Sequence, residues 1–132
     1  MRQLTDHIVE GDSANHQLTI DVRDEPGQGG ACHDYLIRGF DATSNPSDGV
    51  IQGDKSARIL FQNGPIKEFG TNGVTHETLL AILIDRLRSF QAGPFAGRPN
   101  AIALTHLEEA LMWLQTRTRE RIKRGVEGTH QK

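Results

Sequence analysis

Residues 75–124 decide the fold, and they read THETLLAILIDRLRSFQAGPFAGRPNAIALTHLEEALMWLQTRTRERIKR. Apolar residues recur in the first part with a period of about 3.6, which predicts a helix with one broad apolar face. Thr75 is a suitable N-cap, and Gly93-Pro94 ends the element beyond Phe90. We therefore expect a first helix from near Thr75. Its apolar face consists of Leu79, Leu80, Leu83, Ile84 and Leu87.

A second helix is predicted from near Pro99 to just before Gly125. Its apolar positions follow a heptad-like spacing, which is typical of a helix that packs along a neighbour. These positions are Leu104, Leu107, Leu111, Leu114 and Thr118. The two helices are predicted to form a hairpin.

The residues before Thr75 show the two-residue alternation of strands, separated by Gly, Pro and Asn turns. Strands are predicted at 18–22 and 33–41, a hairpin joins 50–51 to 57–62, and a short strand follows at 66–69. The fold class is therefore α+β, an N-terminal antiparallel β-sheet followed by a C-terminal two-helix hairpin. Residues 1–16 are expected to form a flexible arm before a single domain, 17–132. Within it, 17–74 form the sheet part, 75–124 the helical hairpin and 125–132 a polar tail.

Composition limits the classes of function. The chain has 132 residues, a net charge of −2 and no apolar run near the ~20 residues of a membrane span. The N-terminal residues lack the apolar core of a secretion signal, so we expect a cytoplasmic protein that does not enter a membrane. Cys32 is the one cysteine, so neither an internal disulfide nor a thiolate metal site is expected.

Basic residues gather at the end of the second predicted helix. Arg117, Arg121 and Arg124 are four and three residues apart, which places their guanidinium groups along one helix face. Guanidinium groups match phosphate oxygens with paired donors, so this stripe is a candidate site for an anionic ligand. The alternative is a solvated helix end, because the helix dipole favours basic residues in the last turns.

The turn between the helices is a second candidate. Phe90 and Phe95 could stack on bases, and Asn100 could pair with a base edge as donor and acceptor. In the alternative interpretation, the two rings close the hairpin core and Asn100 caps the second helix.

No sequence motif indicates catalysis. The six histidines are scattered and match no zinc pattern, and the phosphate-binding, dinucleotide-binding and nucleophile-elbow motifs do not occur. We therefore expect no enzyme activity, no metal and no cofactor.

Three stretches between Arg58 and His130 resemble the Thoeris anti-defence family of phages and prophages. They are ILFQNGPIKEFGTNGVTHETLLAILIDRL, FQAGPFAGRPNAIAL and LEEALMWLQTRTRERIKRGVEGTH. The hairpin is also similar to that of the anti-CBASS sponge proteins. The resemblance implies a phage protein in the cytoplasm of the infected host. It implies that the protein sequesters cyclic ADP-ribose isomers, which TIR-domain enzymes make, without cleaving them. Some members of the family also sequester cyclic di- or trinucleotides. The resemblance further implies homodimers that assemble into homohexamers.

The family's pocket residues map onto Phe90, Asn100, Arg117 and Arg121, with Arg58 as the candidate for an arginine from the sheet. Seventeen residues of helix separate Asn100 from Arg117, which corresponds to about 25 Å. If both residues contact one small ligand, they must therefore come from different subunits of an antiparallel two-fold dimer. Two alternative functions stay open. The chain could be a nucleic-acid-binding phage regulatory protein or an enzyme that hydrolyses the messenger.

Overall fold

The computed structural model describes residues 2–48 and 53–131. The chain divides into two compact units, Met1–Asn63 and Gly64–Lys132. The first unit contains the sheet and the second contains the helical hairpin, so the predicted α+β class with sheet before helices is confirmed. The sheet part was expected to extend to residue 74, but the boundary between the two units lies after Asn63, and the segment that follows belongs to the helical unit.

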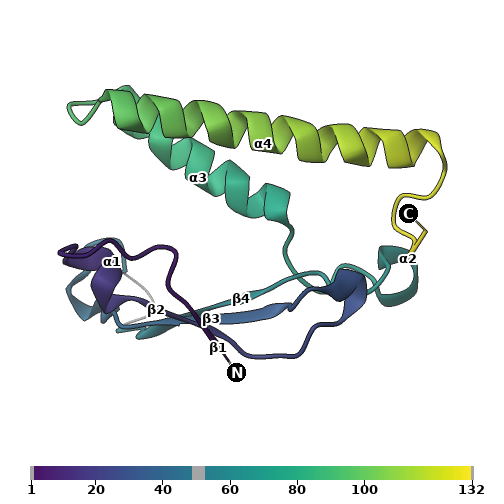
Figure 1. Cartoon of the computed structure of the whole chain (residues 1–132), viewed down its shortest axis with the longest axis horizontal. Helices are drawn as coiled ribbons and strands as arrows, with labels where there is room; N and C mark the ends of the chain where they lie inside the picture. Colours follow the sequence, from purple (N-terminus) through teal and green to yellow (C-terminus); the bar gives the residue numbers. More distant parts are fainter. Residues whose placement is uncertain (1, 49–52, 132) are drawn as a thin grey trace. The chain divides into compact units, whose positions relative to one another are not determined.

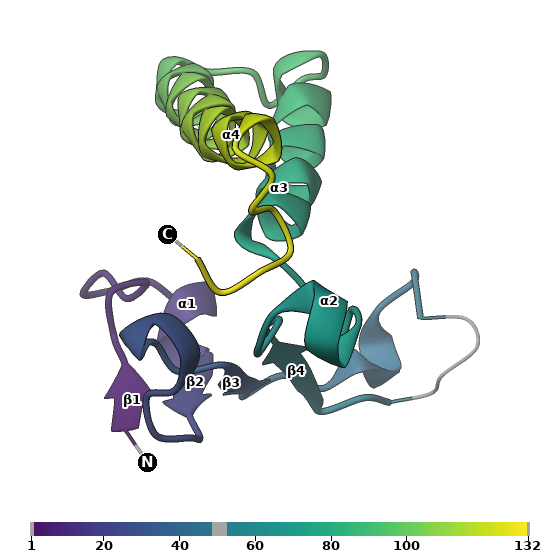
Figure 2. The same cartoon turned by 90° about the vertical axis from the view of Figure 1, so that its right-hand side faces the viewer.

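The first unit is a four-stranded antiparallel meander with the order β1-β2-β3-β4 (Figure 2). Its strands are β1 Arg2–Leu4, β2 Thr19–Val22, β3 Asp34–Arg38 and β4 Ser56–Leu60. Between them lie the short helix α1, Ala14–Gln17, and the 3₁₀ turns η1, Gln28–Gly30, and η2, Ala42–Ser44. Strands β2 and β3 are shorter forms of the strands predicted at 18–22 and 33–41, and β4 overlaps the strand predicted at 57–62. Residues 50–51 lie outside the described residues.

Within the expected arm of residues 1–16, Arg2–Leu4 form the strand β1. Strand β1 pairs with β2, with Leu4 opposite Ile20, and the Gln3 amide donates to the Asp21 carboxylate at 3.0 Å. Backbone pairing and one polar side chain hold β1 in place. The strand therefore needs no run of apolar residues that would mark it in the sequence.

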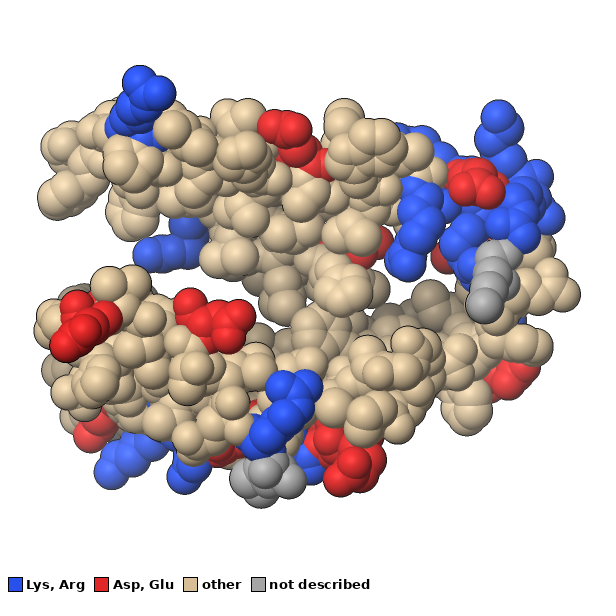
Figure 3. Space-filling model, in the orientation of Figure 1, with Lys and Arg blue, Asp and Glu red and all other residues tan. Residues whose placement is uncertain are grey.

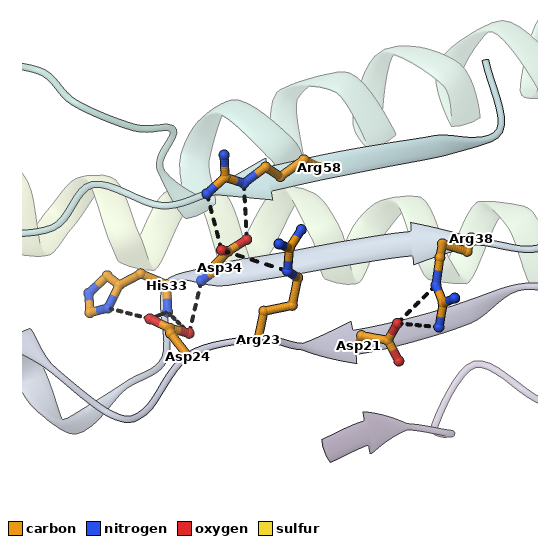
Figure 4. Close-up of polar contacts among 7 residues, drawn as sticks. All are labelled: Asp21, Arg23, Asp24, His33, Asp34, Arg38 and Arg58. Atoms are coloured by element: carbon orange, nitrogen blue, oxygen red, sulfur yellow. Dashed lines mark hydrogen bonds and ion pairs between the residues drawn. The ribbon is translucent and has the colours of Figure 1, made fainter. Parts of the chain in front are cut away.

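The sheet encloses both apolar and charged side chains. Val22 is 1% exposed and Asp21 is 3% exposed, on opposite faces of β2. Arg38 on β3 donates to Asp21 from Nε at 3.0 Å and from Nη2 at 2.6 Å, so the buried carboxylate has a charged partner (Figure 4). After β3, Gly39 has φ +99°, and a Cβ there would lie 1.9 Å from the Gln17 carbonyl oxygen. Only glycine fits this turn.

The second unit begins with α2, Ile66–Phe69, and continues with α3, His76–Gln91, and α4, Arg98–Lys123 (Figure 1). The predicted strand at 66–69 is therefore wrong. Pro65 precedes one helical turn, in which the Gly70 N–H donates to the Ile66 carbonyl at 2.7 Å.

The predicted helical hairpin is confirmed, because α3 lies beside α4 in both ribbon views (Figures 1 and 2). Thr75 is the N-cap of α3 and accepts from the Thr78 N–H at 3.2 Å, while the Thr78 hydroxyl accepts from the Thr75 N–H. Ile84 is the most buried residue of α3, at 3% exposed. The predicted apolar positions of α4 are half-buried along the helix, namely Leu104, Leu107, Leu111, Leu114 and Thr118.

Candidate ligand site at the two ends of the helical hairpin

The turn end of the hairpin carries an aromatic cluster. Phe90 lies in the last turn of α3, where its ring contacts the Phe95 ring edge-on with a centroid separation of 6.5 Å. The Arg86 guanidinium carbon lies 5.4 Å from the Phe90 ring centroid, a cation–π distance. Phe90 is 38% exposed and Phe95 is 74% exposed. The Phe90 ring is therefore held by neighbours and still partly open to solvent, as a stacking surface requires.

Sequence reasoning missed Arg86. The signal was present, because Arg86 precedes Phe90 by four residues and such pairs meet on one helix face.

Asn100 lies in the first turn of α4 and does not cap the helix. The N-cap is Gly97, which has no side chain to accept a hydrogen bond, so the capping alternative for Asn100 is wrong. The Asn100 amide Nδ2 instead donates to the Phe95 carbonyl at 3.4 Å. The contact is long, and it leaves the side-chain oxygen and the second amide hydrogen for other partners. Asn100 and Phe90 thus lie on the two sides of one turn.

The basic end of α4 lies at the opposite end of the hairpin, where lysine and arginine side chains gather over its last turns (Figure 3). Arg117 is exposed, and it makes no hydrogen bond or ion pair with any residue in the described parts of the chain. Arg124 lies 3.5 Å from the Glu120 carboxylate, four residues earlier on the helix. That pair is exposed and therefore weak. The exposed guanidinium group of Arg117 is accessible to an anionic ligand.

Arg121 differs from Arg117, because its guanidinium group contacts the chain's own C-terminal segment. Nη2 donates to the Val126 carbonyl at 2.9 Å and to the Thr129 carbonyl at 3.0 Å, and Nη1 donates to the Gln131 carbonyl. Sequence reasoning missed these contacts, because every acceptor is a backbone oxygen.

The two ends do not meet within one chain. Asn100 and Arg117 belong to the same continuous helix, and 17 residues at ~1.5 Å each separate them by about 25 Å. Phe90 and Asn100 are therefore brought together, as are Arg117, Arg121 and Arg124, but the two groups stay apart.

Arg58 lies on β4 in the sheet unit. Its Nε and Nη2 atoms each donate to an Asp34 carboxylate oxygen at 3.1 Å, and Arg23 Nε lies 4.0 Å from the same carboxylate (Figure 4). The hydrogen bonds from Arg58 lower the pKa of Asp34, and the charges of Arg58 and Arg23 lower it further, against the opposing effect of desolvation. The Arg58 side chain is 54% exposed. The sequence analysis did not identify Asp34 as the partner of Arg58, because the pairing of β3 with β4 brings the two residues together.

Metal sites and membrane-spanning helices are two further features of interest. Within residues 2–48 and 53–131, no group of three or more His, Cys, Asp or Glu side chains is placed to hold a metal ion. None of the helices in these residues is both long enough and apolar enough to cross a membrane.

The chain is similar to known proteins. The family model of the Acb2/Tad1 hairpin domain matches residues 53–119. The chain is also similar to a protein of Bacillus phage SBSphiJ7 named Thoeris anti-defense 1, with 58% identity over 78 residues. That match covers 59% of this chain and 55% of the phage protein, so the chain spans about half the length of this relative. Because the family model covers half of the chain, including α3 and α4 as far as residue 119, the chain belongs to the Acb2/Tad1 hairpin family.

Proposed function

We propose that this chain is a phage anti-defence protein that binds cyclic nucleotide messengers of bacterial immunity and sequesters them without cleavage. The proposed ligands are cyclic ADP-ribose isomers, and cyclic di- or trinucleotides as a further class. Family membership and the name of the phage relative support the anti-defence role. In this proposal the protein acts in the cytoplasm of the infected host, with neither a metal nor a cofactor.

The chemistry of the two hairpin ends suits such a ligand. A cyclic nucleotide presents a base with a flat face and a hydrogen-bonding edge, together with negatively charged phosphates. The partly exposed ring of Phe90 would stack on the base, and Asn100 would pair with its edge. Arg117 has a guanidinium group without a partner in the described residues, and it would pair with a phosphate.

The observation that carries the proposal is the position of these groups on one continuous helix. The base-binding group lies at the first turn of α4 and the phosphate-binding group near its last turns, about 25 Å apart. Two copies of α4 that run antiparallel would bring the turn end of one subunit to the basic end of the other. A two-fold dimer forms two such pockets.

Exposed apolar side chains on the long helices support self-association. Ile82 and Leu83 on α3 are 59% and 47% exposed, and Met112 and Trp113 on α4 are 49% and 66% exposed. Apolar surface of this kind is typical of a surface that a partner covers. We propose a homodimer as the binding unit, with a homohexamer as its further assembly.

A protein that only captures a messenger has no turnover to multiply its effect. It must therefore be present at a concentration comparable to that of the messenger and bind it with a dissociation constant well below that concentration.

Mass spectrometry of the captured ligand tests the proposal. The protein is incubated with the products of a TIR-domain enzyme and with cyclic di- and trinucleotides, desalted and then denatured. We expect intact messenger at about one molecule per subunit. Recovery of a hydrolysed product would show an enzyme, and recovery of no nucleotide would refute capture. An Arg117→Glu variant is the matched control and should release little messenger.

The basic end of α4 favours a second candidate, a nucleic-acid-binding regulatory protein (Figure 3). Binding of that kind weakens steeply with salt, since it releases counterions from the phosphate backbone. A salt-sensitive shift of duplex DNA by the wild-type protein, together with no capture of cyclic nucleotides, would favour this candidate.

A further inference from the structure

The C-terminal segment 126–131 folds back onto the helical unit, although the sequence analysis expected a short polar tail. Gly125 ends α4 with φ +73°, and the Val126 N–H donates to the Arg121 carbonyl at 3.0 Å. Val126 is only 9% exposed. The Gly128 carbonyl accepts from the Lys67 N–H at 3.1 Å, so the segment is also attached to α2.

Arg121 is the centre of this arrangement. Three carbonyl oxygens of the segment, from Val126, Thr129 and Gln131, surround the two terminal nitrogens of one guanidinium group. This ring of oxygens resembles the surroundings that a phosphate group would provide. The acceptors are neutral, however, and no carboxylate in the described residues forms an ion pair with Arg121.

This difference in charge decides which partner Arg121 prefers. The guanidinium group forms charge-assisted hydrogen bonds with either acceptor, but an anionic phosphate adds the attraction between opposite charges, which a neutral carbonyl lacks. A phosphate that reaches Arg121 would therefore displace the carbonyls. Apart from its hydrogen bonds, the described part of the segment has one buried apolar side chain, Val126, and an exposed pair in which His130 Nδ1 lies 3.8 Å from Glu68.

We propose that segment 126–131 occupies the anion site at Arg121 and that the phosphate of a bound messenger displaces it. The inference rests on the proposed function. It adds that segment 126–131 of the chain competes with the ligand's phosphate for Arg121. Arg117 and Arg124 would meet the incoming anion first, and Arg121 would join them once its carbonyl partners have left. The apparent affinity of the protein is then lower than its intrinsic affinity by the fraction of molecules in which the segment is released.

A glycine substitution loosens the segment without altering the proposed ligand-binding residues. Gly128 has φ +79°, and an added Cβ would lie 3.5 Å from Lys67 Cγ, so Gly128→Val strains the docked conformation. Gly11→Val is the matched control, because Gly11 has φ +88° and no atom lies within 4 Å of its added Cβ. Both variants are titrated calorimetrically with a cyclic ADP-ribose isomer. Hydrogen exchange of the amides of residues 126–131 is measured with and without this ligand.

We expect Gly128→Val to bind the isomer up to roughly tenfold more tightly than the wild type, and Gly11→Val to bind unchanged. In the wild type, the ligand should speed exchange of the Val126 and Thr129 amides. Binding by the loosened variant alone would also support the inference.

Two results would overturn the inference while leaving the proposed function intact. They are an unchanged or weaker affinity of Gly128→Val, and slower exchange of the segment on binding. If neither the wild type nor the variant binds the isomer, the proposed function fails and the inference fails with it.

Discussion

Replacing Phe90 by leucine separates base stacking from packing at the turn. With 38% of its surface exposed, Phe90 buries roughly 120 Å² of a typical ~200 Å² aromatic side chain, so its packing contributes about 3 kcal/mol. Leucine keeps most of this apolar contact, and such exchanges usually cost less than ~1.5 kcal/mol. The aromatic face is lost completely, however. Stacking on a base contributes ~1–3 kcal/mol, so the dissociation constant should rise roughly 5- to 150-fold.

The assay is calorimetric titration with a cyclic ADP-ribose isomer, accompanied by circular dichroism and mass measurement of the oligomer. Phe95→Leu is the matched control, since it makes the same chemical change in the same turn at a residue that is 74% exposed. We expect that control to bind within about threefold of the wild type. If Phe90→Leu binds as the wild type does, Phe90 is not the stacking residue, and if both variants lose affinity equally, stacking is not specific to Phe90.

Three further predictions concern charge, packing and pH. Arg117→Glu should weaken messenger binding more than Arg117→Gln, because it adds repulsion to the lost charge-assisted hydrogen bond; equal affinities in titration would remove the phosphate role. Ile84→Ala should lower the free energy of unfolding by about 2–5 kcal/mol in urea, whereas Ile82→Ala, two residues away and 59% exposed, should cost no more than ~0.5 kcal/mol in the monomer. A larger cost at Ile82 that depends on protein concentration would place it in a subunit interface. The Gln3 hydrogen bond and then Arg38 lower the pKa of Asp21, so the stability from this carboxylate is present above about pH 4 and lost as the pH falls through the folded-state pKa. Asp21→Asn should therefore reduce the loss of stability on acidification, and an unchanged acid profile would contradict this assignment.

The two long helices, α3 and α4, were predictable because their signals are local and strong. The apolar residues of α3 and α4 recur with a helical period over several turns. Thr75 marks the start of α3, and Gly125 marks the end of α4. The strands β2 to β4 were predictable from alternation, although their ends were less sharp. Strand β1 was missed because its three residues contain one apolar side chain, and it is held by pairing with a strand that is distant in the sequence.

The segment at 66–69 shows how a short apolar run can mislead. Ile66 and Phe69 were interpreted as part of a strand, but they are three residues apart, which is also the spacing of one helical turn. Pro65 is the N-cap of this turn, with φ −64° and an extended ψ of 136°, and the helix begins directly after it.

The sequence indicated which residues form the candidate site, but not which groups they contact in the structure. The positions of Phe90, Asn100 and Arg117 follow from helix geometry and were placed correctly on their elements. The partners of Arg121 are backbone carbonyls, and the partner of Arg58 lies on a neighbouring strand. Contacts of these two kinds depend on tertiary structure, and the pattern of side chains does not encode them directly. The ligand roles of all six candidate residues, Phe90, Asn100, Arg117, Arg121, Arg124 and Arg58, stay predictions.

The cross-subunit pocket is tested most directly by mixing two defective proteins. One carries Phe90→Ala and Asn100→Ala, and the other carries Arg117→Gln and Arg121→Gln, so that neither binds the messenger alone. In a two-fold dimer of the two proteins, one pocket holds all four changes and the other has every native residue. Co-expression should therefore restore binding at about one ligand per mixed dimer. If mixed dimers form, as confirmed by mass, and bind no ligand, the two ends of α4 do not share a pocket between subunits.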